Sequence, residues 1–258
     1  MKIGFVGSGV ITEAIVTGLM KGEGSAHEII ISHRNSEVSA RLAKTYGEVR
    51  VEQDNQTIID DADLVILSVI PQIAEEVVTG LTFRQGMKLI SLIATVTHEK
   101  LQSWILEKVD IVRAIPLPFV ANKTGLTAIF PQDATAYKLF SGLGDVIQVD
   151  SLDRFDAIAV TSAHMGTYFG VLENGAQWLV SKGVPYPDAR RYVASLFLRL
   201  GETAYKDSNI SFDALREGHS TPGGLNEQLF HVFSGNNGLG ALNTALDDVL
   251  ERVRSSAS

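Results

Sequence analysis

The N-terminal segment reads MKIGFVGSGVITEAIVTGLMKG over residues 1–22. An apolar run typical of a strand ends at Val6, and a helical pattern begins near Thr12. Between them stand two glycines, Gly7 and Gly9, separated by one serine. At a strand–helix turn the first glycine permits the tight bend, and the second lacks a Cβ that would keep backbone amides from a pyrophosphate. We therefore predict a dinucleotide phosphate at this turn.

The motif is incomplete at its third small residue. Thr12 stands where a third glycine would let helix and strand pack closely. We expect Ala14, two residues further on, to take over that packing role.

The first 150 residues alternate strand-like and helical stretches. Strands are predicted at 2–6, 28–32, 64–68, 88–93 and 110–115, helices near 12–21, 36–46, 73–81 and 98–107, and one or two more strands at 124–130 and 145–149. Near-continuous runs of Ile, Val and Leu are typical of strands buried on both faces. The alternation predicts an α/β fold with a parallel sheet and right-handed crossovers.

The pattern changes near residue 150, after which long helical stretches replace the strands. One apolar face runs over residues 155–183 and ends at a Lys-Gly pair followed by VPYP, a helix stop. Pro187 opens the next helix, and amphipathic segments follow at 225–233 and 239–253. We predict a dinucleotide-binding domain at 1–150 and a helical domain at 151–258, packed closely because no flexible linker separates them.

Composition limits the possible partners. The chain has 22 basic and 30 acidic residues, a formal net charge of −8, and no basic run, which argues against nucleic acid or anionic membrane as a partner. It has no cysteine, so disulfides, thiolate metal sites and a cysteine nucleophile are excluded. The six histidines lack metal-ligand spacing, and we expect no metal. Without a long apolar span or a signal-peptide pattern, we predict a cytoplasmic protein.

The end of the second predicted strand indicates which dinucleotide binds. An NAD-binding chain usually carries a carboxylate there for the ribose hydroxyls. Here the segment reads ISHRNS, with Ser32, Arg34 and Asn35 and no carboxylate. A hydroxyl, a guanidinium and an amide suit a phosphate group. We therefore predict NADPH in preference to NADH.

Several motifs, taken together, resemble one family over nearly the whole chain. They are GFVGSGVITEAIVTGL, QDNQTI with Asn55, SVIPQ, SLIATVTHEKLQSWI, VRAIPLP and STPGGLNEQ. The chain resembles the pyrroline-5-carboxylate reductases, which reduce a cyclic imine to proline with NAD(P)H. The resemblance implies a Rossmann domain followed by an all-helical dimerisation domain, in a homodimer or higher homo-oligomer whose partner subunit completes the active site.

The resemblance also implies the site residues. The cofactor would contact Gly7, Gly9, Val10, Ile11, Ser32, Arg34, Asn35, Asn55, Ser68, Val69, Pro71 and Ala94. The imine would contact Thr221, Pro222, Gly223, Gly224 and Asn226, with exposed amides of the Pro-Gly-Gly loop receiving its carboxylate and Asn226 meeting its nitrogen.

Imine reduction chiefly requires that the enzyme hold the imine against the nicotinamide and exclude water. A general acid helps if the imine binds in its neutral form. His164 and His219 flank the segments that line the family's substrate pocket, and imidazole exchanges protons near neutral pH. Together with Asn226 they form the predicted catalytic set.

The chain departs from the family at several positions. Ile70 replaces a lysine near the cofactor, Thr95 replaces a glycine, and Leu117 replaces an asparagine. Ala163-His164-Met165 replaces a stretch of small residues beside the substrate, and Leu225 replaces a threonine. These changes leave the identity of the imine open.

Two other functions are compatible with the sequence. A β-hydroxyacid dehydrogenase-like enzyme shares the general layout, but its catalytic lysine would fall at Gly170, four residues before Asn174. A non-catalytic NADP-binding regulatory protein would explain the changes at Ile70 and at Ala163-His164.

Overall fold

The computed structural model describes residues 1–22 and 27–255. They divide into two compact units, one made of the described residues up to 160 together with 249–255, and the other of residues 161–248. The predicted division into a dinucleotide-binding domain at 1–150 and a helical domain at 151–258 stays a prediction. Within the described residues no helix is long and apolar enough to cross a membrane.

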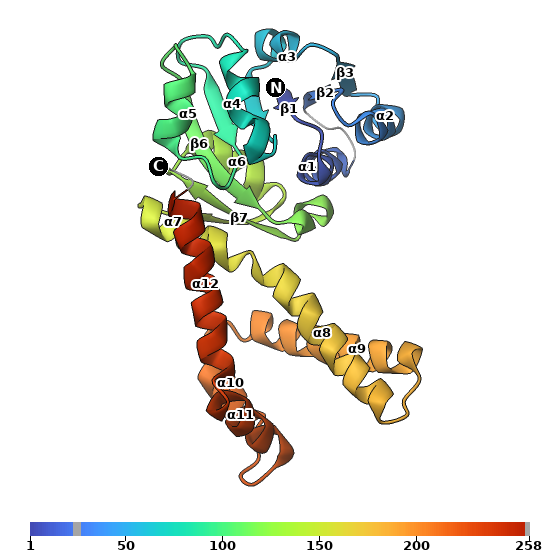
Figure 1. Ribbon diagram of the computed structural model, residues 1–258. Helices are drawn as coiled ribbons and strands as arrows, with labels where there is room; N and C mark the ends of the chain where they lie inside the picture. The colour runs from blue at the N-terminus through green and yellow to red at the C-terminus, as the bar shows by residue number, and fades with distance from the viewer. Residues whose placement is uncertain (23–26, 256–258) are drawn as a thin grey trace. The chain divides into compact units, whose positions relative to one another are not determined.

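The first unit is built on one eight-stranded sheet (Figure 1). Its strands are β1 (Lys2–Val6), β2 (Glu28–Ser32), β3 (Val49–Glu52), β4 (Leu64–Leu67), β5 (Lys88–Ser91), β6 (Asp110–Pro116), β7 (Gly125–Phe130) and β8 (Gly144–Gln148). Their order is β3-β2-β1-β4-β5-β6-β7-β8. The strands β2 and β3 follow β1 on one side of it, whereas β4 and the later strands lie on its other side. The strand order therefore reverses between β1 and β4.

Two layers of helices cover the sheet. They are α1 (Val10–Met20), α2 (Ser36–Thr45), α3 (Asn55–Asp61), α4 (Pro71–Thr79), α5 (His98–Trp104), the short 3-10 helix η1 (Pro118–Asn122) and α6 (Ala134–Ser141). One apolar core contains α1, α2, η1 and α6, and a second contains α3, α4 and α5. Strands buried by both layers explain the continuous aliphatic runs of the sequence.

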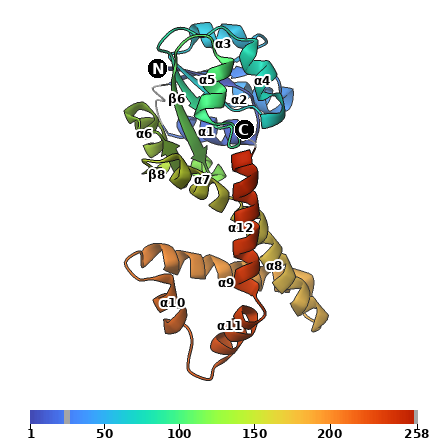
Figure 2. The ribbon, with the colours of Figure 1, turned by 60° about the vertical axis from the view of Figure 1, so that its left-hand side comes forward.

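The second unit is helical. It contains α8 (His164–Ser181), α9 (Tyr186–Lys206), α10 (Phe212–Gly218), α11 (Leu225–Gly235) and the first part of α12 (Gly238–Ser255), whose last residues belong to the first unit with α7 (Leu152–Thr161). Helices α8 and α9 pack around Ala176, Ala189 and Val193 (Figure 1). Figure 2 shows α10 and α11 following α9 along the chain.

The predicted α/β architecture followed by helices is confirmed, with corrections in detail. The sheet is not parallel throughout, because β6 and β7 pair antiparallel. Only η1 joins them, and a parallel connection needs a crossover of a dozen or more residues. The helical pattern over 155–183 is interrupted between α7 and α8, at Ser162 and Ala163. The strand β3 and the helices α3, α6 and α10 were not predicted.

Close packing of α1 on η1 depends on Gly18. A Cβ at this position would lie 2.2 Å from the Val120 carbonyl oxygen and 2.8 Å from a Leu143 methyl carbon. We predict that Gly18→Ala lowers the free energy of unfolding by about 1–3 kcal/mol, since overpacking outweighs the gain in helix propensity. Urea denaturation measures it. Gly47→Ala, with nothing within 4 Å, serves as control. Wild-type stability of the Gly18 variant would contradict the packing.

Candidate nucleotide and substrate site

A cavity of about 450 Å³ opens at the carboxyl edge of the sheet, where the strand order reverses. Ligands of open α/β sheets bind at such a switch point. Its lining comes from three strand–helix turns: Gly7, Ser8 and Gly9 after β1, Arg34, Asn35, Ser36 and Glu37 after β2, and Ser68, Val69, Ile70 and Ile73 after β4. Seven of the twelve predicted cofactor residues are therefore brought together: Gly7, Gly9, Arg34, Asn35, Ser68 and Val69 directly, with Ser32 bonded to the Arg34 amide.

Gly7 is fixed by its backbone and by its neighbours. Its φ of +112° lies in a region that side chains disfavour, and a Cβ would lie 2.7 Å from the Ser68 carbonyl oxygen. The Thr12 hydroxyl donates to the Gly7 carbonyl at 3.1 Å and lies 2.8 Å from the Ser68 hydroxyl. Thr12 is fully buried. The position that lacks the third glycine thus carries a hydroxyl that ties β1, α1 and β4 together.

Gly9 leaves the N-terminus of α1 open. It is the N-cap residue, provides no side chain to cap the helix, and a Cβ there would meet nothing within 4 Å. The first amides of a helix have no acceptor within the helix. Val10, the first helical residue, is 75% exposed. Amides of Val10 and Ile11 at an uncapped helix end fit the phosphate of a dinucleotide.

The loop after β2 presents an exposed cation, Arg34, beside two hydrogen bonds of Asn35. The Asn35 amide donates to the Ser8 hydroxyl at 2.9 Å, and its side-chain oxygen caps α2 by accepting from the Val38 amide at 3.2 Å. The Arg34 amide donates weakly to the buried Ser32 hydroxyl. In the described part of the chain, no carboxylate forms an ion pair with the Arg34 guanidinium. It is therefore available to a phosphate.

The other predicted cofactor residues lie around this cavity without lining it. Asn55 begins α3 just beyond β3, and its buried side-chain oxygen has no hydrogen-bond partner among the described residues. Pro71 is the first residue of α4. Ala94 is exposed in the turn after β5. Ile70, which replaces the family's lysine, is 59% exposed and turns this wall of the cavity apolar.

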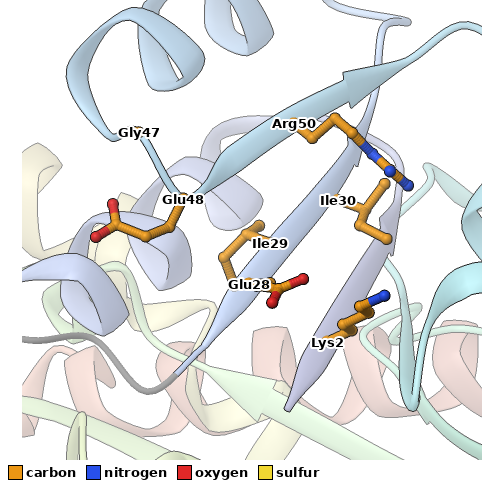
Figure 3. A pocket seen from close by; sticks show the side chains of 7 residues that line it. All are labelled: Lys2, Glu28, Ile29, Ile30, Gly47, Glu48 and Arg50. Carbon is orange, nitrogen blue, oxygen red and sulfur yellow. The ribbon is translucent and has the colours of Figure 1, made fainter.

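A second cavity, of about 240 Å³, lies where β1, β2 and β3 begin (Figure 3). It is lined by Lys2, Glu28, Ile29, Ile30, Gly47, Glu48 and Arg50. Arg50 pairs there with Glu52 at 3.0 Å and with Asp61, and the hydrogen bond to Arg50 lowers the pKa of the exposed Asp61 carboxyl. Acids and bases of this cavity compensate each other, and it lies at the wrong edge of the sheet for a dinucleotide.

The Pro-Gly-Gly loop precedes α11 in the second unit. Gly223 has φ +72°, and Gly224 is the N-cap residue of α11 without a side-chain cap. The Gly223 amide donates to the Glu227 carboxylate at 2.7 Å, and the Gly224 amide donates to the Thr221 carbonyl at 2.8 Å. The sequence predicted that these loop amides are exposed for the carboxylate of a substrate. In the structure both already have internal acceptors.

The predicted catalytic residues are partly brought together. The Asn226 side-chain amide donates to the His219 carbonyl at 2.7 Å, so these two residues share one loop. The His219 ring bonds the Leu215 carbonyl through Nδ1 at 2.8 Å, and the His164 ring bonds the Thr161 carbonyl through Nδ1 at 2.9 Å. A carbonyl acceptor requires a proton on Nδ1, so Nε2 carries the lone pair of each neutral ring. His164 begins α8, and no described hydrogen bond joins it to the loop.

Three residues with defined polar contacts were missed from the sequence: Arg113, Asp156 and Glu227. Arg113 and Asp156 form a buried ion pair at 3.3 Å, with side chains 2% and 7% exposed. A lone arginine inside a predicted strand gives no signal of burial, because its partner lies 43 positions away. Glu227 was missed for a similar reason, since a carboxylate in a first helical turn usually only complements the helix dipole.

Both halves of the chain match families of known proteins. Residues 2–95 match the family model described as NADP oxidoreductase coenzyme F420-dependent, and residues 153–256 match pyrroline-5-carboxylate reductase dimerisation. Pyrroline-5-carboxylate reductase 2 of Bacillus subtilis is 31% identical over 189 residues, covering 68% of each chain. Pyrroline-5-carboxylate reductase of Haemophilus influenzae is 27% identical over 242 residues, covering 90% of this chain and 88% of the relative.

Solved structures share the fold. A 1-pyrroline-5-carboxylate reductase from Streptococcus pyogenes superposes with a TM-score of 0.86 at 24% identity, covering 99% of this chain and 98% of the other. The Plasmodium falciparum pyrroline carboxylate reductase with NADP bound superposes with a TM-score of 0.83 at 16% identity, covering 100% and 98%.

The fold and the switch-point cavity define a nicotinamide-dinucleotide-dependent oxidoreductase with a helical dimerisation domain. Within that class, the chain belongs to the pyrroline-5-carboxylate reductase family.

The two glycines of the turn predict different mutational outcomes. Gly9→Ala adds a Cβ that meets only the open cavity, so we expect unfolding free energy within about 1 kcal/mol of wild type. NADPH affinity should fall by about 1.4 kcal/mol or more, a factor of about ten. Gly7→Ala should lose both affinity and about 1–3 kcal/mol of stability, since its φ is strained for alanine. Fluorescence titration and urea denaturation measure these; full affinity in both variants would contradict the phosphate site.

Proposed function

We propose that the protein reduces 1-pyrroline-5-carboxylate, a cyclic imine, to proline with NADPH as the hydride donor. The observation that carries the proposal is the cavity at the β1/β4 switch point, in a chain whose relatives are named for this reaction. The uncapped end of α1 and the free guanidinium of Arg34 fit the two phosphate-bearing parts of NADPH. When bound, the nicotinamide supplies a hydride to the imine carbon.

The residues of this chain hold the reactants and accommodate charge. Amides at the start of α1 face the pyrophosphate, and Arg34 with Ser32 and Asn35 receives the phosphate on the adenosine ribose. We assign Asn55, with its unpartnered oxygen, to the same cofactor. Val69, Pro71 and Ala94 follow β4 and β5 at the same edge and are proposed to contact the other half of the dinucleotide.

The imine is proposed to bind at the loop before α11. Thr221, Pro222, Gly223 and Gly224 form this loop, and Asn226 is the second residue of α11. The first amides of α11, at Leu225 and Asn226, lie at an uncapped helix end suited to the carboxylate of the substrate. The imine nitrogen gains a proton during reduction. When the imine binds neutral, the proposed donor is the imidazolium form of His219 or His164, which gives up its Nε2 proton and becomes a neutral ring with the proton on Nδ1.

The helical unit is proposed to form a homodimer or a higher homo-oligomer. Large apolar side chains are exposed along α8, α9 and α11: Tyr168, Phe169, Trp178, Tyr192, Leu196, Leu198, Leu229, Val232 and Phe233. A surface of this kind favours burial against another subunit. Residues 153–256 match a dimerisation family, which supports the same conclusion. A cytoplasmic location stays a prediction from the sequence.

Arg34 should set the choice between NADPH and NADH. Arg34→Ala removes a charge-assisted contact worth about 1.5–3 kcal/mol, so we predict that the ratio of kcat/KM for NADPH over NADH falls by about 10- to 150-fold. Steady-state kinetics with both cofactors measures the ratio. Arg41→Ala is the control, because Arg41 pairs with Glu13 at 2.7 Å outside the cavity lining. An unchanged ratio in Arg34→Ala would contradict the assigned phosphate contact.

The reaction itself is tested by following NADPH absorbance with pyrroline-5-carboxylate and a panel of other cyclic imines. We predict turnover of pyrroline-5-carboxylate with proline as product. NADPH binding without turnover of any imine would favour a non-catalytic regulatory protein, and oxidation of a β-hydroxyacid with NADP would favour the dehydrogenase alternative.

The contribution of the loop is tested by Asn226→Ala. We predict that kcat/KM for the imine falls about tenfold through loss of one hydrogen bond of about 1.5 kcal/mol, with NADPH affinity unchanged. Asn236→Ala is matched, since Asn236 donates to the Val232 carbonyl at 2.7 Å at the other end of α11. Equal effects of the two substitutions on the imine kinetics would count against Asn226.

A further inference from the structure

One guanidinium joins three segments of the first unit. Arg113 lies within β6 and is 2% exposed. Its Nη2 donates to the Ala94 carbonyl at 2.7 Å, and its Nη1 lies 3.3 Å from the Asp156 carboxylate. The central guanidinium carbon, Cζ, lies 4.6 Å from the centre of the Phe155 ring. The turn after β5 and the helix α7 are therefore both attached to β6 through this side chain.

Burial of this cation is costly. Burial lowers the pKa of the Arg113 guanidinium, and the nearby Asp156 carboxylate opposes that shift. A well-packed apolar pair would often be as stable as a buried ion pair, so stability alone is a weak reason for the arrangement. A guanidinium differs from an apolar side chain, and from lysine, in presenting several donors in a rigid plane. Here two of those donors serve acceptors on different segments.

The segment that Arg113 holds lies on the nicotinamide side of the sheet. In the strand order, β2 carries the phosphate-binding Arg34, β1 carries the glycine turn, and β4 and β5 follow on the other side. A dinucleotide with its adenosine over β2 and its pyrophosphate over β1 must extend toward β4 and β5. Ala94 lies in the turn after β5, closed by a hydrogen bond from the Val96 amide to the Ile93 carbonyl at 3.2 Å.

The contact with Ala94 also orients a peptide group. In a trans peptide the carbonyl and the following N–H point in opposite directions. Because Arg113 holds the Ala94 carbonyl, the Thr95 N–H must point away from the guanidinium. The hydrogen bond from Arg113 to the Ala94 carbonyl therefore fixes the direction of the Thr95 N–H.

We propose that Arg113 is a positioning residue for the nicotinamide half of the cofactor, acting through the Ala94 carbonyl, while Asp156 serves to neutralise it. The proposal rests on the proposed function of the cavity. In this ion pair Arg113 sets the geometry of the site, and Asp156 maintains the stability of the fold.

Two conservative variants separate these roles. Arg113→Lys keeps the charge near Asp156 but has a single nitrogen, which cannot serve both acceptors in the same plane. Asp156→Asn keeps an oxygen beside Arg113 but leaves the buried charge without a counterion. Arg154→Lys, on α7 in an exposed pair with Asp150 at 2.8 Å, is the control.

Two binding measurements need no turnover. We expect Arg113→Lys to bind adenosine 2′,5′-bisphosphate like wild type, because the β1 and β2 turns are intact. The change in nicotinamide fluorescence when NADPH binds should be reduced. With an active wild type, kcat of the lysine variant should fall about tenfold or more, as for a misplacement of about 1 Å, and KM for NADPH should change little. A 4-deuterated NADPH should show a larger isotope effect on kcat than in wild type.

Asp156→Asn should behave in the opposite way. We expect a lower urea midpoint, with nicotinamide fluorescence and kcat of the folded protein close to wild type. The proposal is overturned if Arg113→Lys retains wild-type nicotinamide fluorescence, or if both variants lose stability and nicotinamide signal to the same extent. An inactive wild type would defeat the proposed reaction, and the fluorescence comparison would still decide the role of Arg113.

Discussion

The close approach of β1 to β4 at Gly7 is the constraint on which the site depends. The backbone there takes a positive φ, and a Cβ at this position would lie 2.7 Å from the Ser68 carbonyl oxygen. The buried Thr12 hydroxyl bonds the Gly7 carbonyl and contacts the Ser68 hydroxyl, so the turn is held from both neighbouring elements. The N-terminus of α1 consequently faces the cavity without a side chain in front of it. The cavity is a product of this turn.

The rest of the cavity follows from the sheet topology. Because the strand order reverses between β1 and β4, the turns after β1, β2 and β4 diverge and leave space between them. Arg34 provides a cation on one side, whereas Ile70 and Ile73 provide an apolar wall on the other. In the proposed complex, the phosphate is recognised after β2 and the β4–β5 side receives the nicotinamide ring. The chain keeps the architecture of its family, and Ile70 makes this wall of the cavity apolar.

Much of the fold could be predicted from local pattern. The strands β1 and β2 were predicted at their observed bounds, because aliphatic runs flanked by turns are unambiguous. The strand β3 was missed, since VRVE is short and half charged, and the break between α7 and α8 carries no glycine or proline. The antiparallel β7 could be predicted as a strand but not in direction, which depends on how the short η1 segment folds back.

Site residues could be predicted where neighbours in the sequence form the site, and could not be predicted where the contact joins residues that only the fold brings together. Glycines at one strand end, and a cation in place of a carboxylate at the end of the next strand, are visible in sequence. The hydrogen bond from the Gly223 amide to the Glu227 carboxylate and the ion pair of Arg113 with Asp156 depend on the folded backbone. The helical unit shows the same limit, since Asn226 and His219 are seven positions apart and meet only because the loop closes.

The most direct test of the account is a crystal structure of the protein with NADP. We predict that the pyrophosphate lies within hydrogen-bond distance of the Val10 or Ile11 amide, and that the phosphate of the adenosine ribose contacts the Arg34 guanidinium. A dinucleotide bound elsewhere, with the turn at Gly7 and Gly9 empty, would contradict it.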